Sequence, residues 1–117
     1  MSSRNDDLPI RENKVIQALS VEVGEETIPF LLERFVLDLE THLPVVVKAA
    51  RAGDATPLER ESHTLKSVSG TFGALRLQQL MTRINECCRH GDFKEALIHA
   101  ERVEAIGKLT LEAFQST

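Results

Sequence analysis

The stretch TPLERESHTLKSVSGTFG, residues 56–73, carries both the boundaries and the apolar pattern of an α-helix. Thr56 and Glu59 have the spacing of a capping box, with Pro57 at the first helical position. Gly73 is a residue at which helices commonly stop, so the sequence predicts a helix that ends just before it. At about 100° per residue, the buried side of this helix would hold the following residues: Leu58, Leu65, Val68 and Phe72, flanked by Ser62 and Ser69.

On both sides of this segment, apolar residues recur every three or four positions, a spacing that is typical of amphipathic helices. Gly24, Gly53 and Gly91 interrupt the pattern and are expected to separate these helices. The predicted helices lie at about residues 11–19, 26–52, 75–90 and 93–114.

Two prolines and one capping pair give further detail on the predicted long helix and on the start of the last helix. Pro29 lies in the first turn of the long helix, where amide groups have no partner within the helix, so it is tolerated. Pro44 lies inside the same helix, removes one hydrogen bond and should kink or split it. Asp92 and Glu95 form a second capping signature at the start of the last helix.

These helices predict an all-α protein with one domain. The 117 residues suffice for one core, and the absence of Trp and Tyr beside five Phe argues against an all-β domain. Four amphipathic helices with short connections fold most simply as an antiparallel four-helix bundle, and the short additional N-terminal helix would cap one end. We expect this bundle to occupy residues 10–117, and residues 1–9 to form a mobile N-terminal tail with nothing to bury.

Charge and apolar content limit the classes of partner and compartment. The net charge is −4, and the 14 basic residues form no run, so a nucleic-acid-binding role has little support. No apolar run reaches the roughly 18 residues of a transmembrane helix, and the polar N-terminus lacks a signal-peptide core. Cys87 and Cys88 are adjacent and are expected to be small buried residues in a reducing compartment. We therefore expect a cytoplasmic protein that binds neither nucleic acid nor membrane.

The side of the 56–73 helix opposite its apolar stripe holds an unusual group around His63. Lys66, three residues on, and Ser67, four residues on, are its neighbours on the helix surface. Gly70 lies about one turn further, although Gly in mid-helix costs about 0.5–1 kcal/mol relative to Ala. A flat patch of small residues beside a reactive group lets another protein's surface approach closely. Glu59 and Arg60 complete this outward face.

His63 brings chemistry to this face. A neutral imidazole is a good nucleophile near a pH of about 7 and could attack phosphorus. Lys66 could balance the charge of a transferred phosphoryl group, and Glu59 could hold the Nδ1 proton of the ring and leave Nε2 free. From helix geometry alone, an ordinary solvated face with a histidine beside a lysine is the other interpretation.

The segment HTLKSVSGTFGA, residues 63–74, resembles the signature of histidine-containing phosphotransfer (HPt) domains, which is close to His-x-Leu-Lys-Gly-Ser-Ser-x-x-hydrophobic-Gly-Ala. Ser67 stands where the family usually has Gly, and Val68 where it often has Ser. Ser is still small, and Val68 faces the predicted core. The layout of helices from about residue 10 to the C-terminus is also similar to the family. The matching positions are His63, Leu65, Lys66, Ser69, Phe72, Gly73 and Ala74.

The resemblance implies that His63 is a phosphoacceptor. It would take a phosphoryl group from the aspartate of one receiver domain, in a response regulator or a hybrid histidine kinase, and pass it to another. The magnesium ion would sit in the receiver, so this chain would need neither metal nor cofactor. Asn85 and Arg89 fall where family members often place polar partners of the histidine, although ordinary surface residues are the other interpretation. The residues expected to dock the receiver are Glu59, Ser67, Gly70, Asn85 and Arg89.

Two interpretations from different classes follow. The first is a monomeric phosphate carrier in a two-component phosphorelay, which would not phosphorylate itself because no P-loop or kinase ATP-binding segment is present in the sequence. The second is a non-catalytic helical adaptor that docks receivers or other helical partners, although an adaptor needs neither His63 nor Lys66. No metal-ligand spacing surrounds the other histidines, so we expect structural or incidental roles for His42, His90 and His99.

Overall fold

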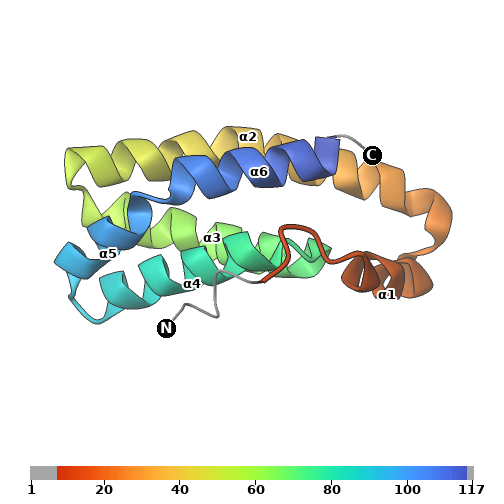
Figure 1. The fold of residues 1–117 in the computed structure, drawn as a ribbon, viewed down its shortest axis with the longest axis horizontal. Coiled ribbons are helices and arrows are strands. Elements are labelled where there is room, and N and C mark those ends of the chain that lie inside the picture. Colours follow the sequence, from red (N-terminus) through yellow and green to blue (C-terminus); the bar gives the residue numbers. More distant parts are fainter. Residues whose placement is uncertain (1–7, 116–117) are drawn as a thin grey trace.

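The computed structural model describes residues 8–115 of the chain. These residues contain six α-helices and one 3-10 turn. The elements are α1 (Asn13–Val23), η2 (Glu25–Thr27), α2 (Ile28–Ala52), α3 (Ala55–Phe72), α4 (Leu75–Arg89), α5 (Phe93–Ala100) and α6 (Val103–Gln115). Neighbouring helices of the set α2, α3, α4 and α6 run in opposite directions, which confirms the predicted antiparallel four-helix bundle (Figure 1). As expected, α1 lies at one end of the bundle (Figure 1).

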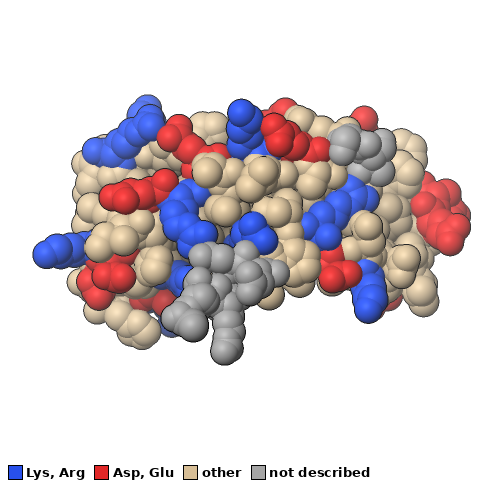
Figure 2. Space-filling view, in the orientation of Figure 1, with Lys and Arg blue, Asp and Glu red and all other residues tan. Residues whose placement is uncertain are grey.

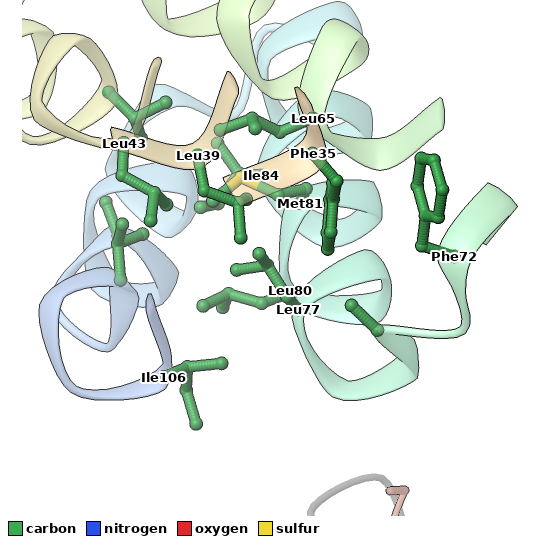
Figure 3. Close-up of a cluster of buried hydrophobic side chains, with 14 of the residues drawn as sticks. Phe35, Leu39, Leu43, Leu65, Phe72, Leu77, Leu80, Met81, Ile84 and Ile106 are labelled. Carbon is green, nitrogen blue, oxygen red and sulfur yellow. The ribbon is translucent and has the colours of Figure 1, made fainter. Parts of the chain in front are cut away.

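The core of the bundle includes Phe35 of α2, which is fully buried. Its ring stacks on Phe72 of α3 with centroids 4.8 Å apart, and meets Phe114 of α6 edge-on at 4.9 Å. Leu65 and Phe72 point into this core as predicted (Figure 3), whereas Val68 is only partly buried. Burial of one Leu or Phe side chain contributes about 1.5–3 kcal/mol, so these contacts determine where α3 lies.

The corner between α2 and α3 is tighter than the sequence predicts. Gly53 ends α2 as expected, with a left-handed backbone (φ 68°, ψ 31°). The next residue, Asp54, has an extended backbone (φ −102°, ψ 100°) and is already the N-cap of α3, which begins at Ala55. The predicted capping box is therefore wrong, because Thr56 and Pro57 lie inside the first turn of the helix. Since Gly53 alone reverses the chain, no longer connection is needed.

Pro44 lies inside α2 without splitting it, because the helix is continuous over Ile28–Ala52. The proline itself is exposed, while its neighbours Leu43 and Val46 are buried in the core. These apolar contacts hold the helix together on both sides of the missing hydrogen bond. Pro29 stands in the first turn of α2, as predicted.

The helix predicted at residues 93–114 is two helices, α5 and α6. Between them, the amides of Glu101 and Arg102 bond to carbonyls three residues back, those of Ile98 and His99. Helix α5 packs mainly on α4, whereas α6 packs mainly on α2, so the chain changes direction at this turn. Neither Gly nor Pro marks the turn, and apolar periodicity therefore runs across it unchanged.

The bounds predicted for the helix 75–90 are confirmed to within one residue, since α4 ends at Arg89. Gly91, which follows the end of α4, has φ 77° and reverses the direction of the chain before α5. The Asp92 carboxylate then accepts a hydrogen bond from the Glu95 amide at 3.2 Å and caps α5, as the capping signature predicts.

The chain before α1 is attached to the start of α4. The backbone carbonyls of Leu8 and Pro9 accept hydrogen bonds from Arg76, at 2.8 and 3.1 Å respectively. The sequence predicts a mobile tail over residues 1–9, of which residues 1–7 lie outside the described residues. Leu8 and Pro9 are bonded to α4, so the folded part of the chain includes them.

Basic and acidic side chains are interspersed over the face shown in Figure 2, with no continuous area of one sign. This distribution agrees with the net charge of −4 and with the absence of a basic run in the sequence. Within residues 8–115, no helix combines the length and the apolar character needed to cross a membrane.

Candidate functional site

The connection between α3 and α4 places these two helices against each other. Gly73 ends α3 in the left-handed region (φ 80°), where residues with a side chain are strained. A Cβ at Gly73 would also lie 2.6 Å from the carbonyl oxygen of Glu12, whose own amide donates to the Gly73 carbonyl at 2.8 Å. Gly73 is thus needed both for its backbone angle and for the packing of the segment before α1, and it fixes the hairpin that carries the site.

His63 lies midway along α3 with its side chain exposed, as the helix geometry predicts. On the same face, Lys66 is half-buried and Ser67 is exposed. Within residues 8–115, no hydrogen bond or ion pair engages the imidazole. The ring is therefore open to a partner, with a cation and a small residue about one turn away.

Glu59 is connected to His63 through its backbone, whereas its side chain does not engage the ring. The predicted hydrogen bond between the Glu59 carboxylate and the His63 ring is not formed among the described residues. The Glu59 carbonyl instead accepts hydrogen bonds from Asn85 Nδ2 at 2.9 Å and Ser62 Oγ at 3.0 Å. In an α-helix the same carbonyl accepts the amide four residues on, which belongs to His63. The backbone that carries His63 is therefore tied to α4 through Asn85.

The two α4 residues that the sequence associates with the site differ in accessibility. Asn85 is only 1% exposed, so a docked partner cannot reach it, and the docking role predicted for it does not fit its position. Its amide nitrogen holds α3, while its amide oxygen has no hydrogen-bond partner among the described residues. Arg89, the last residue of α4, is exposed and accessible to a partner.

Gly70 does not form the open patch that the sequence predicts. A Cβ at this position would overlap the amide nitrogen of Gln78 and lie 3.0 Å from its Cδ. The Gln78 side chain, from α4, thus fills the space that Gly70 leaves. A helical wheel of α3 cannot reveal this neighbour because it belongs to another helix. The signal that would have found it is the antiparallel register about Gly73, which brings the start of α4 beside the end of α3.

The positions of the other histidines fit the structural or incidental roles expected for them. His42 Nδ1 lies 2.6 Å from Glu61 Oε1, in a half-buried contact that joins α2 to α3. His99 Nε2 lies 3.8 Å from Glu95 Oε2, one turn away on α5. His90 is exposed at the end of α4.

Cys87 and Cys88 are free thiols and are half-buried, less than the sequence predicts. Burial raises the pKa of both thiols above the usual cysteine value, and nearby carboxylates add to it, Asp92 at Cys87 and Glu59 at Cys88. Because the thiolate is the nucleophilic form, a raised pKa makes both thiols weaker nucleophiles near neutral pH. Among residues 8–115, no group of three or more His, Cys, Asp or Glu side chains is placed to hold a metal ion.

Comparison with known proteins relates this geometry to a family. The model of the family described as "Hpt domain" matches residues 31–115. The phosphorelay protein LuxU of Vibrio vulnificus is 33% identical over 85 residues, which cover 73% of this chain and 74% of that protein. LuxU of Vibrio harveyi is 26% identical over 101 residues, which cover 86% and 89% of the two chains. The crystal structure of histidine-containing phosphotransfer protein B (HptB) from Pseudomonas aeruginosa PAO1 matches with a TM-score of 0.81 and 31% identity, over 92% of this chain and 93% of that chain.

Proposed function

The chain belongs to the Hpt domain family, and from this premise we propose that His63 is the residue that carries the phosphoryl group. The chain is a histidine phosphotransfer module of a phosphorelay. The observation that supports His63 is its exposed imidazole, free of hydrogen bonds from residues 8–115, inside the segment that matches the family signature. A nucleophile of this kind needs an accessible nitrogen and a partner that can approach it.

In the proposed reaction, the Nε2 lone pair of the neutral His63 ring attacks the phosphorus of an aspartyl phosphate in a receiver domain. A bond forms between nitrogen and phosphorus, the bond from phosphorus to the aspartate oxygen breaks, and the carboxylate leaves with its electron pair. The ring keeps the proton on Nδ1. Transfer to a second receiver is the reverse step, with the carboxylate of that receiver as the attacking group. The Lys66 ammonium stabilises the charge on the phosphoryl group during both steps.

The receiver would dock on the outward face of α3, where the exposed side chain of Ser67 is small enough to let it approach the ring. Glu59 and Arg89 are exposed at the far end of the same hairpin and would contribute polar contacts at the edge of this interface. Asn85 would have an indirect role, because it holds the Glu59 carbonyl and thereby the backbone of His63.

Receiver domains are the class of partner that the family implies. Five finer statements belong to the proposal. The chain acts as a monomeric carrier, in the cytoplasm, without a cofactor of its own, and residues 10–117 form one domain. It accepts phosphate only from a receiver and does not phosphorylate itself from ATP. The absence of nucleotide-binding motifs from the sequence supports the last of these statements, and the cluster of buried apolar residues that runs from Ile16 to Phe114 within residues 8–115 supports the single domain.

The test is to mix the chain with a receiver domain that carries radiolabelled aspartyl phosphate and to map the label. We expect an acid-labile, base-stable label on His63 in the parent chain and none on His63→Gln. The matched control is His90→Gln, which removes another exposed histidine and should accept label like the parent. Circular dichroism should give the same helical content for all three proteins, because both side chains are exposed.

Label on His63→Gln at the rate of the parent would contradict the proposal. Binding of the receiver without any transfer of label would instead favour the non-catalytic adaptor. Incubation with radiolabelled ATP alone tests the statement about autophosphorylation, and a label under that condition would contradict it.

A further inference from the structure

The side chain of Gln78, from α4, lies against the outward face of α3. The half-buried Gln78 lies over Gly70, where a Cβ would come 3.0 Å from Gln78 Cδ and overlap the amide nitrogen. Within residues 8–115, no hydrogen bond engages the Gln78 amide. Its nitrogen and oxygen are also absent from the set of buried, unpaired polar atoms, so they are accessible at the surface. An accessible amide with two donors and one acceptor group therefore lies against α3.

Gly70 is the residue that permits this placement. A Gly in mid-helix is less stable than Ala because it gains conformational freedom in the unfolded chain. Nothing in the backbone demands Gly here, since only Gly24, Gly53, Gly73 and Gly91 have positive φ among the described glycines. What the missing Cβ provides is the space in which the Gln78 amide lies.

Gly70 lies on the same stripe of α3 as His63. Seven residues correspond to about 700°, so the two positions differ by only about 20° around the helix and by about 10 Å along it. One side of a protein–protein interface covers about 800 Å², which is a disc of about 16 Å radius. A receiver centred on His63 therefore also covers the position of Gln78.

We infer that Gln78 is a contact residue for the receiver domain, placed over Gly70 so that its amide meets polar backbone or side-chain groups of the receiver about 10 Å from the contact between His63 and the phosphorylated aspartate. The inference rests on the proposed function, because it takes the receiver to be centred on His63. A side chain that already lies against α3 loses little conformational freedom on binding. Its hydrogen bonds to the receiver therefore contribute to the affinity with little entropic cost. Gly70 acts through Gln78 and is a positioning residue.

The experiment measures the dissociation constant of one receiver domain, chosen by its binding to the parent chain, by isothermal titration calorimetry. Gln78→Ala removes the amide, and we expect about three- to tenfold weaker binding. Gly70→Ala keeps the amide but displaces it, and should weaken binding by a similar factor while leaving the melting temperature unchanged or higher. In the double variant, Gly70→Ala should weaken binding no further. The controls are Gln17→Ala, an exposed glutamine of α1, and Thr71→Ala, an exposed neighbour of Gly70.

Unchanged receiver binding by Gln78→Ala would overturn the inference. A double variant whose loss of affinity equals the product of the two single-variant losses would also overturn it, because Gly70 would then act independently of Gln78. The proposed function is tested separately with phosphoramidate, a small phosphodonor that needs no docking. Its phosphorus–nitrogen bond breaks, ammonia leaves, and the phosphoryl group bonds to the imidazole. We expect equal labelling of His63 in the parent and in all variants. Failure of this labelling would reject His63 as the acceptor while the calorimetric comparison still decides on Gln78.

Discussion

Leu65 and Lys66 are adjacent in α3 but belong to regions of different character. Leu65 is fully buried against the bundle, whereas Lys66 is half-buried on the face that holds His63. Even the polar residues of the inward face, Ser62 and Ser69, are fully buried. The inward face therefore determines where α3 lies, and the outward face determines what it can do.

The two faces of α3 meet at the backbone carbonyl group of Glu59. Ser62 and Asn85, both buried, donate hydrogen bonds to the carbonyl oxygen of Glu59, which the backbone amide of His63 also approaches in the helix. The inward face thus holds the backbone of the site without using any outward side chain. It follows that outward substitutions can change transfer without changing stability, and inward ones change stability first.

The largest expected effect on stability is that of Leu65→Ala. Loss of a fully buried Leu removes apolar burial and leaves a cavity, so we expect a decrease of about 2–5 kcal/mol in the free energy of unfolding. Urea denaturation followed by circular dichroism measures this decrease. A decrease below about 1 kcal/mol would show that the core closes around the cavity at position 65. The inward and outward faces of α3 would then differ less in their contribution to stability than their burial indicates.

Lys66→Ala should have the opposite profile. Its side chain is half-buried, so the free energy of unfolding should change by less than about 1 kcal/mol. One well-placed charge contact to the phosphoryl group contributes about 1–3 kcal/mol, so transfer should be about ten- to a hundredfold slower. Rapid-quench measurement of receiver-to-His63 transfer tests this, with Lys108→Ala on α6 as the exposed control. An unchanged transfer rate would show that Lys66 is an ordinary surface lysine.

The same contrast explains which parts of the fold follow from the sequence. The inward stripe of α3 and the exposure of His63 depend only on the period of one helix, so a wheel predicts both. The ends of α3 and α4 are also predictable, because Gly73 and Gly91 adopt left-handed backbone angles that favour glycine. By contrast, the turn at residues 101–102 has no such marker and depends on which neighbours α5 and α6 pack against.

The candidate site divides in the same way. His63, Lys66 and Ser67 lie on one helix, and their relative positions follow from its period. The roles of Gly70 and Asn85 depend on contacts between α3 and α4, with Gln78 over the first and the Glu59 carbonyl beside the second. Such contacts require the register of two helices, which no single-helix pattern contains. This is why Gly70 is predicted as open and Asn85 as a surface residue.

The smallest expected effect is that of Ser67→Gly, which tests whether size or the hydroxyl matters at this position. Ser67 is exposed about one turn after His63, with Cβ atoms roughly 5–6 Å apart, so a partner that reaches the ring must pass over it. Ser67→Gly should keep the parent's transfer rate, at a helix cost of about 0.5 kcal/mol. Ser67→Leu and Ser67→Arg should fold normally, because both are good helix formers on an exposed face, yet they should suppress transfer in both directions. Thermal melting and transfer rates of the three variants test this. Transfer by Ser67→Arg at the parent's rate would mean that the receiver does not approach across this face, even if His63 is the phosphorylated residue.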